Sequence, residues 1–251
     1  MLPVENTLFC PEVIYSLGIR CHTEIFLKKH KYRMFSSVLG SANCKTLEIL
    51  YDMLKNKFSF LQDRARQVST NGIRYYDRMN KLYGYRTLIN GYDNLKDYHQ
   101  ATLPHHDLTN LQVYTHFIRG LSRLEKIAKL RTPILFIITA NAIDDKYFIH
   151  NQHKVDLILK ELKKTFNAHL LVVIAGYKRE NAAAKTFKEQ LIVDNRLYKY
   201  EVTKNSTYMT TIKHEYTHRE SEQELFGNII QKYFAPQKLL SIERIDQIQI
   251  E

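Results

Sequence analysis

The stretch from Val13 to His22 decides the fold of this chain, and it reads Val-Ile-Tyr-Ser-Leu-Gly-Ile-Arg-Cys-His. Its β-branched and aromatic start favours a short strand, and Gly18 then provides a tight turn. From His22 to Lys31, apolar Ile25 and Phe26 fall on one side, which predicts a helix. The chain therefore opens with a strand, a glycine turn and a helix.

Two unbroken apolar runs come later, at residues 134–139 and 170–175, and helical patterns flank them. We expect helices over 155–166, 181–191 and 220–233, and a further strand over 197–202. Short buried strands alternating with helices are typical of parallel strands joined by crossovers. The sequence therefore predicts an α/β fold with three layers and a mostly parallel sheet.

The segment of about residues 40–130 is expected to be a helical, Tyr-rich insertion after the first strand–helix unit. A first helix is predicted from apolar residues at helical spacing, with Asn43 near its cap: Leu47, Leu50, Leu54, Phe58 and Leu61. A second is predicted around Val68 to Tyr83.

The best-specified helix follows Thr109-Asn110-Leu111-Gln112, which matches a capping box. Its predicted apolar stripe comprises Leu111, Tyr114, Ile118, Leu121, Leu124 and Ala128. Because no Pro-, Ser- or Gly-rich linker interrupts the pattern, we expect residues 1–251 to form a single α/β domain.

Composition limits the function classes. The 251 residues carry a formal net charge of +11, which favours anionic partners such as a polyanionic glycan, a phosphorylated donor or a membrane surface. The Lys and Arg residues are scattered and no zinc-finger or RNA-recognition signature accompanies them, which argues against nucleic acid. Three cysteines, no signal-like start and no apolar run long enough to cross a bilayer predict a cytoplasmic protein.

Cys21 is the leading candidate nucleophile. Ligands of parallel sheets bind beyond the carboxyl ends of strands, where the turn from Gly18 to Cys21 is expected. Unpaired amides at a helix N-terminus favour a thiolate, and Arg20 and His22 add positive potential. The alternative is that Cys21 is a small buried residue closing the junction between strand and helix.

A candidate base lies in His105-His106-Asp107, directly before the capped helix. A histidine beside a carboxylate is what a thiol nucleophile needs as a base and an orienting group. Alternatively, Asp107 caps the helix or binds a donor, and both histidines are surface residues.

A competing motif is His214-Glu215-Tyr216-Thr217-His218, which satisfies the H-E-x-x-H pattern of zinc enzymes. Its polar surroundings are unlike those of zinc-protease helices, so a polar loop is the competing interpretation. His218 follows a late strand, so it is also a candidate for joining the Cys21 site. We expect no resident metal and no tightly bound cofactor.

The quoted residues resemble a bacterial family of papain-like cysteine peptidases whose genes often accompany those for surface polysaccharides. The resemblance rests on the opening around Ser16-Leu17-Gly18 and Cys21, on His106-Asp107-Leu108, and on a helix with Arg119 and Arg123. It implies Cys21 as the nucleophile, His106 as its base and Asp107 as the orienting group. The family's usual Phe-Asp-Trp segment is replaced by the residues Phe35 to Gly40.

The opening is also similar to that of a capsule-biosynthesis family thought to use a cysteine and coenzyme A. We therefore expect a cysteine-dependent O-acyltransferase or thiol hydrolase of surface-polysaccharide assembly. Its partners would be a glycan or an activated acyl donor such as acyl-coenzyme A, with peripheral association to membrane machinery. Gly18, Arg20, His22, His105 and His218 would bind the substrate or donor. One alternative is a glycosyl or phosphosugar transferase that binds a nucleotide sugar at the Gly18 turn. Another is a basic module that binds nucleic acid or another polyanion.

Overall fold

The centre of the structure is a five-stranded sheet in the order β1-β8-β9-β11-β10. The computed structural model describes residues 8–18, 22–40, 43–44, 47–57, 67–69, 75–76, 82–83, 86–89, 101–104, 106, 110–141, 154–178, 188–194, 196–205, 227–234, 236 and 239–249. The strands are β1 (Val13–Ser16), β8 (Pro133–Asn141), β9 (Asn167–Lys178), β10 (Lys188–Asp194) and β11 (Leu197–Asn205). All pairings in this sheet are parallel except β10 with β11.

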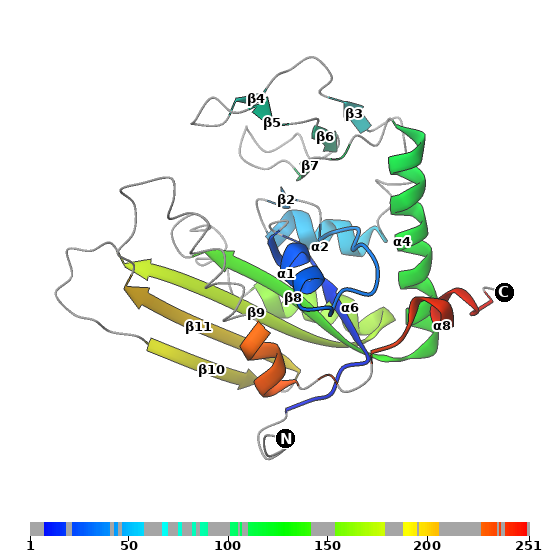
Figure 1. Ribbon diagram of the computed structural model, residues 1–251. Helices are drawn as coiled ribbons and strands as arrows, with labels where there is room; N and C mark the ends of the chain where they lie inside the picture. The colour runs from blue at the N-terminus through cyan, green and yellow to red at the C-terminus, as the bar shows by residue number, and fades with distance from the viewer. Residues whose placement is uncertain are drawn as a thin grey trace.

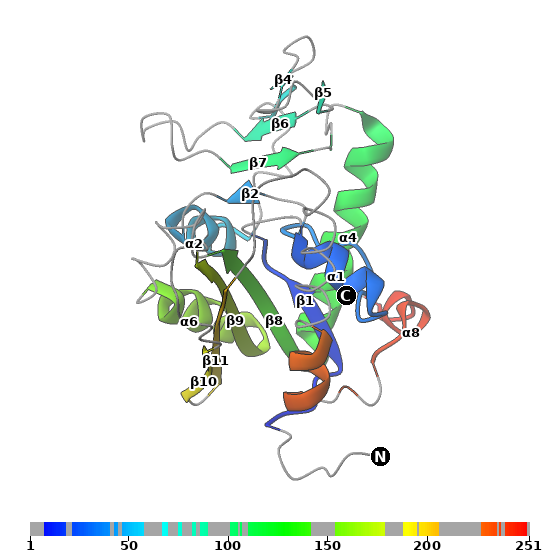
Figure 2. The ribbon, with the colours of Figure 1, turned by 60° about the vertical axis from the view of Figure 1, so that its left-hand side comes forward.

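Helices cover both faces of this sheet, so the predicted three-layer α/β class is confirmed (Figures 1 and 2). Because successive side chains of a strand point to opposite faces of the sheet, the central strands contribute apolar side chains to the hydrophobic core on each face. One layer joins the sheet to α2 (Leu47–Lys55), α4 (Leu111–Leu130) and α6 (Val155–Thr165). The other joins it to α1 (His22–Lys29) and to a helix over residues 227–233.

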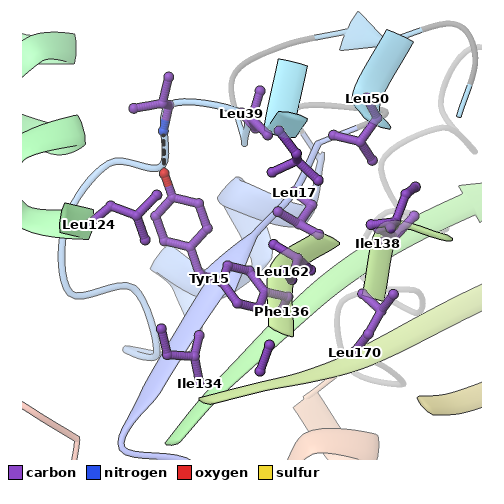
Figure 3. Packing of buried hydrophobic residues seen from close by; sticks show 14 of the residues in the cluster. Tyr15, Leu17, Leu39, Leu50, Leu124, Ile134, Phe136, Ile138, Leu162 and Leu170 are labelled. Atoms are coloured by element: carbon purple, nitrogen blue, oxygen red, sulfur yellow. Dashed lines mark hydrogen bonds between the residues drawn. The ribbon is translucent and has the colours of Figure 1, made fainter. Parts of the chain in front are cut away.

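Tyr15 carries a polar group into the larger core. Its ring packs among buried apolar side chains such as Phe136 and Leu124 (Figure 3). The hydroxyl accepts a hydrogen bond of 2.9 Å from the N–H of Val38. Burial raises the pKa of Tyr15, so it stays a neutral phenol in the core. The end of β1 is thereby joined to the segment around Val38.

The expected helix over Val68 to Tyr83 is wrong, because the described residues there are strands. β3 (Gln67–Ser69), β6 (Arg86–Ile89), β7 (Ala101–Pro104) and β2 (Asn43–Cys44) form a four-stranded antiparallel sheet in the order β2-β7-β6-β3, and β4 (Tyr75–Tyr76) pairs with β5 (Leu82–Tyr83). Tyr, Thr and Val favour strands when hairpin partners are available, which local helix periodicity cannot weigh. Figures 1 and 2 both show this small sheet above α1 and α2, on the side toward which β1 runs.

Several finer expectations also need correction. Asn43 lies in β2 and does not cap α2. Residues 188–191 belong to β10 instead of a helix, because they pair with β11 across a hairpin. Ile25 is 51% exposed, since α1 buries Phe26 and Leu27 toward the sheet.

The predicted stripe of α4 is rotated in the structure. The N-cap is Asn110, whose side chain accepts from the N–H groups of Gln112 and Val113, so the helix starts at Leu111. Leu111 is 64% exposed. The buried residues of α4 are Phe117, Gly120, Leu121, Leu124 and Ile127. This choice of face brings a glycine, which has no side chain, against the segment that follows α1.

Candidate active site

The turn after β1 has the geometry that its glycine predicted. Gly18 is buried with a φ of 85°, a region that L-residues with a side chain rarely adopt. Its N–H lies 3.4 Å from Ser16 Oγ. The first helical residue of α1 is His22, so Cys21 is the residue immediately before the helix. Ile19, Arg20, Cys21 and the side chain of His22 lie outside the described residues.

Thr23 attaches the first turn of α1 to the neighbouring strand. Its side chain is fully buried, and its Oγ1 lies 2.5 Å from Oγ1 of Thr139 in β8. β8 is the strand that pairs with β1. The two ends of the turn, Gly18 and Thr23, are therefore both held at the carboxyl edge of the sheet.

Glu24 holds the other side of the same helical turn. Its Oε1 accepts hydrogen bonds of 3.1 Å from the N–H of Ser37 and from Nη1 of Arg33. The Ser37 hydroxyl donates to the carbonyl oxygen of Ser16 at 2.5 Å and accepts from the N–H of Gly40 at 2.8 Å. The segment from Phe35 to Gly40, which we call the 35–40 segment, is thereby bonded to both β1 and α1.

The carboxyl group of Glu24 is buried at some energetic cost. Its side chain is 7% exposed, and Oε2 is buried without a hydrogen-bond partner among the described residues. A buried acceptor left unpaired costs about 1–3 kcal/mol. Desolvation raises the pKa of Glu24, although the Ser37 N–H and Arg33 partly oppose this shift. Such a group is expected where a function requires it.

The 35–40 segment also contacts α4. A Cβ added to Gly120 would lie 2.9 Å from the carbonyl oxygen of Ser36 and 3.7 Å from Cγ2 of Val38, so the backbones are in close contact. One turn earlier on α4, the ring of Phe117 meets the ring of His106 edge-on, with centroids 5.0 Å apart. His106 is half-buried. The segment therefore lies between the Gly18 turn and the helix that supports His106.

Three arginines lie close enough to His116 on α4 to affect its protonation. Desolvation, together with the nearby charges of Arg119, Arg33 and Arg123, lowers the pKa of His116 on α4. Arg33 is paired with Glu24, and Arg123 is paired with Asp246. Arg119 is instead exposed on α4, where it suits the attraction of an anionic substrate or donor.

The remaining predicted residues lie outside the described part of the chain. These are His105, Asp107, His214, Glu215 and His218, so the distance from His106 to Cys21, the orienting role of Asp107 and the zinc motif stay predictions. Sequence reasoning missed Thr23, Glu24 and Ser37. One signal was available for Glu24, because Cys21-His22-Thr23-Glu24 has the spacing of a helix cap with an acidic residue three positions later.

A strand, a buried glycine turn and a helix preceded by a cysteine define an α/β protein with a candidate thiol nucleophile. The sequence model of a family described as "putative papain-like cysteine peptidase" matches residues 12–176. The chain belongs to this family. No curated protein and no solved structure matches the chain. The matched residues include the Gly18 turn, Cys21, Glu24, His106 and α4.

Within the described residues, no helix combines the length and the apolar character needed to cross a membrane. The longest of them, α4, has 20 residues. Its exposed side carries Arg119, Glu125 and Lys129.

Proposed function

We propose that this protein is a cysteine-dependent acyl-transfer enzyme in which Cys21 is the nucleophile, His106 its base and Asp107 the orienting group. Membership of the papain-like cysteine peptidase family is consistent with a cysteine-nucleophile hydrolase. The observation that carries the proposal is the buried Gly18 turn with a φ of 85°, directly before a helix that starts one residue after Cys21. A thiol at such a helix N-terminus is stabilised as a thiolate.

In the proposed reaction, His106 takes the thiol proton of Cys21, and the thiolate attacks the carbonyl carbon of an ester or thioester. The tetrahedral intermediate collapses as the bond to the leaving oxygen or sulfur breaks, and His106 gives the leaving group a proton. His106 then accepts a proton from the acyl acceptor, which attacks the acyl-enzyme and releases the thiolate. The amides of the turn would bind the oxyanion.

The acceptor would be water or a sugar hydroxyl, giving a hydrolase or an O-acyltransferase. The net charge of +11 favours an anionic glycan or a donor with phosphates, such as acyl-coenzyme A. Arg119, which is exposed on α4, would then attract the substrate. A role in surface-polysaccharide assembly is part of this proposal.

The first test measures alkylation of each cysteine between pH 5 and pH 10, read by peptide mass mapping. We expect Cys21 to react with an apparent pKa well below the reference value of about 8.5, and His106→Ala to raise it. Cys10, which is exposed and free, gives the internal comparison.

The second test measures turnover of p-nitrophenyl acetate and acetyl-coenzyme A, with and without a sugar acceptor. Cys21→Ser should lower turnover at least about 1,000-fold, as expected for loss of a nucleophile, whereas Cys10→Ser should leave it unchanged. Full turnover in Cys21→Ser would overturn the proposed function. Release of the acyl group to water alone would identify a hydrolase.

A further inference from the structure

A buried cluster next to the end of β1 and the first turn of α1 has no part in the reaction described so far. It consists of Ser16, Glu24, Arg33, Ser37 and Gly40, and we call it the Glu24 cluster. Ser16, Glu24, Ser37 and Gly40 are buried. Two hydrogen bonds of the cluster join the 35–40 segment to the first turn of α1 and to β1, and two more add Arg33 and Gly40.

The bonds of the cluster converge on the two ends of the Cys21 turn. Ser16, at the carboxyl end of β1, is bonded through its carbonyl oxygen to Ser37. Glu24, three residues after Cys21, is bonded through Oε1 to the backbone of Ser37. Ser37 therefore links Ser16, which precedes the turn, to Glu24, which follows it. The hydrogen bond between Thr23 and Thr139 joins α1 to β8.

The backbone of Gly40 packs closely against the other members of the cluster. A Cβ on Gly40 would lie 2.6 Å from Glu24 Oε2, 2.8 Å from Ser37 Cβ and 3.0 Å from Ser16 Cβ. Oε2 is buried without a hydrogen-bond partner among the described residues. A core that required only stability would place an apolar side chain here, because a half-satisfied buried carboxyl group is unfavourable.

We infer that Glu24 is a positioning residue, which acts through Ser37 and Ser16 to hold the turn that carries Cys21 in its reactive geometry. This inference rests on the proposed role of Cys21. Glu24 itself touches no reacting atom. Its carboxyl oxygen fixes the 35–40 segment, and that segment fixes both ends of the turn. Thiol reactivity at a helix N-terminus depends on the alignment of the turn with the first amides of the helix.

The experiment compares the pH–rate profile of Cys21 alkylation by iodoacetamide in the wild-type chain and in Glu24→Ala, Glu24→Gln and Ser37→Ala. Glu24→Ala should slow the reaction at pH 7 on the order of tenfold and move the profile toward that of an ordinary thiol at about pH 8.5. Glu24→Gln keeps an acceptor for Ser37 and Arg33, so it should recover most of the lost rate. Ser37→Ala breaks the bond to Ser16 and should slow the reaction in the same direction.

The matched control is Glu48→Ala. Glu48 also lies in the first turn of a helix, α2, and its carboxylate also pairs with a cation, Lys154. This variant should lose stability in urea denaturation without a change in the Cys21 profile. Urea denaturation of each variant shows whether a change in the alkylation profile comes from unfolding or from the turn itself. If Glu24→Ala does not fold, the comparison is made with Ser37→Ala.

The outcomes separate this inference from the proposed function. If Cys21 reacts no faster than Cys10 in the wild-type chain, the proposed function fails. If wild-type Cys21 reacts fast and folded Glu24→Ala and Ser37→Ala keep its profile, the inference is overturned while the nucleophile stands. If Glu48→Ala shifts the profile as much as Glu24→Ala, the effect reports general stability, and the inference is likewise overturned.

Discussion

The imidazole of His169 in β9 is stacked on the ring of Phe9 and lies nearly parallel to the ring of Tyr198. The ring centroids of Phe9 and His169 are 3.6 Å apart, with an interplanar angle of 4°. The centroids of His169 and Tyr198 are 5.9 Å apart, with an interplanar angle of 7°. Nδ1 of His169 is 2.9 Å from the Tyr198 hydroxyl. Desolvation, followed by the charges of Arg196 and Lys163, lowers the pKa of His169 to about 4.

The lowered pKa of His169 leads us to expect a loss of stability in mild acid. Because its folded pKa is below the ordinary value of 6.5, the unfolded chain binds the proton first, so stability is complete above pH 6.5 and falls toward pH 4. We expect a contribution of about 1–2 kcal/mol, after a discount for the exposed part of the ring. Urea denaturation at pH 7 and pH 4.5 should show a smaller loss in His169→Gln than in the wild-type chain.

The control is Tyr198→Phe, which removes the hydroxyl but keeps the titrating imidazole. It should lower stability at both pH values and retain most of the wild-type dependence on pH. Equal pH dependence in His169→Gln and the wild-type chain would show that His169 is not the titrating group.

At the scale of the residue, the sequence predicted Gly18 better than the residues that support its turn. Gly18 was identified because its lack of a side chain permits a positive φ, which is a local property. Glu24 and Ser37 were missed because their importance comes from contacts 13 residues apart in the chain. A single sequence contains no signal for such a hydrogen bond.

Among the elements, α4 depends most on one close contact. Gly120 lets the helix approach the 35–40 segment, and an added Cβ would meet the backbone oxygen of Ser36 at 2.9 Å. We expect Gly120→Ala to destabilise the protein by about 1–2 kcal/mol, even though alanine favours a helix over glycine by about 1 kcal/mol. Thermal and urea denaturation measure the change.

The comparison for this prediction is Ser122→Ala at a half-buried position of the same helix, which also raises helix propensity. It should be neutral or slightly stabilising. A stabilising effect of Gly120→Ala would mean that the segment moves away from α4 at little cost. Alkylation of Cys21 in the same variant would then show whether that movement reaches the Gly18 turn.

Element type was predictable where periodicity and burial agree. The strands β8, β9 and β11 and the helix α6 follow the predicted runs, because continuous apolar stretches between helices specify buried parallel strands. The strands from β3 to β7 were not predicted. Their pairing is antiparallel and short, so it depends on partners elsewhere in the chain and not on local spacing.

At the scale of the molecule, the carboxyl-terminal helix α8 (Ile242–Asp246) is fastened to α4. Arg123 donates two hydrogen bonds to Asp246, at 2.8 and 2.6 Å, and Lys126 donates to its carbonyl oxygen. The hydrogen bond from Arg123 is the main cause of the lowered pKa of Asp246. Residues about 120 positions apart are joined in this way.

Asp246→Asn should therefore loosen α8 with a small cost in stability. The side chain of Asp246 is 46% exposed, so we expect about 0.5 kcal/mol, decreasing with added salt. The contribution is present above the ordinary pKa of an aspartate and fades as the pH falls below it. Hydrogen exchange of residues 242–248 at low and high salt measures the effect, with Glu243→Gln as the control in the same helix. Unchanged exchange in Asp246→Asn would contradict this role.

The strand order has a further consequence for how this chain can diverge. The residues that the family's sequence model matches end at 176, inside β9. β1 with the Gly18 turn occupies one edge of the sheet, whereas the β10–β11 hairpin occupies the opposite edge, beyond β9. Two strands, β8 and β9, separate the hairpin from β1 and the Gly18 turn. Substitutions or insertions in the hairpin are therefore made at a distance from the turn. The strands of the hairpin edge can thus change in sequence without a direct contact with the strand that precedes the Gly18 turn.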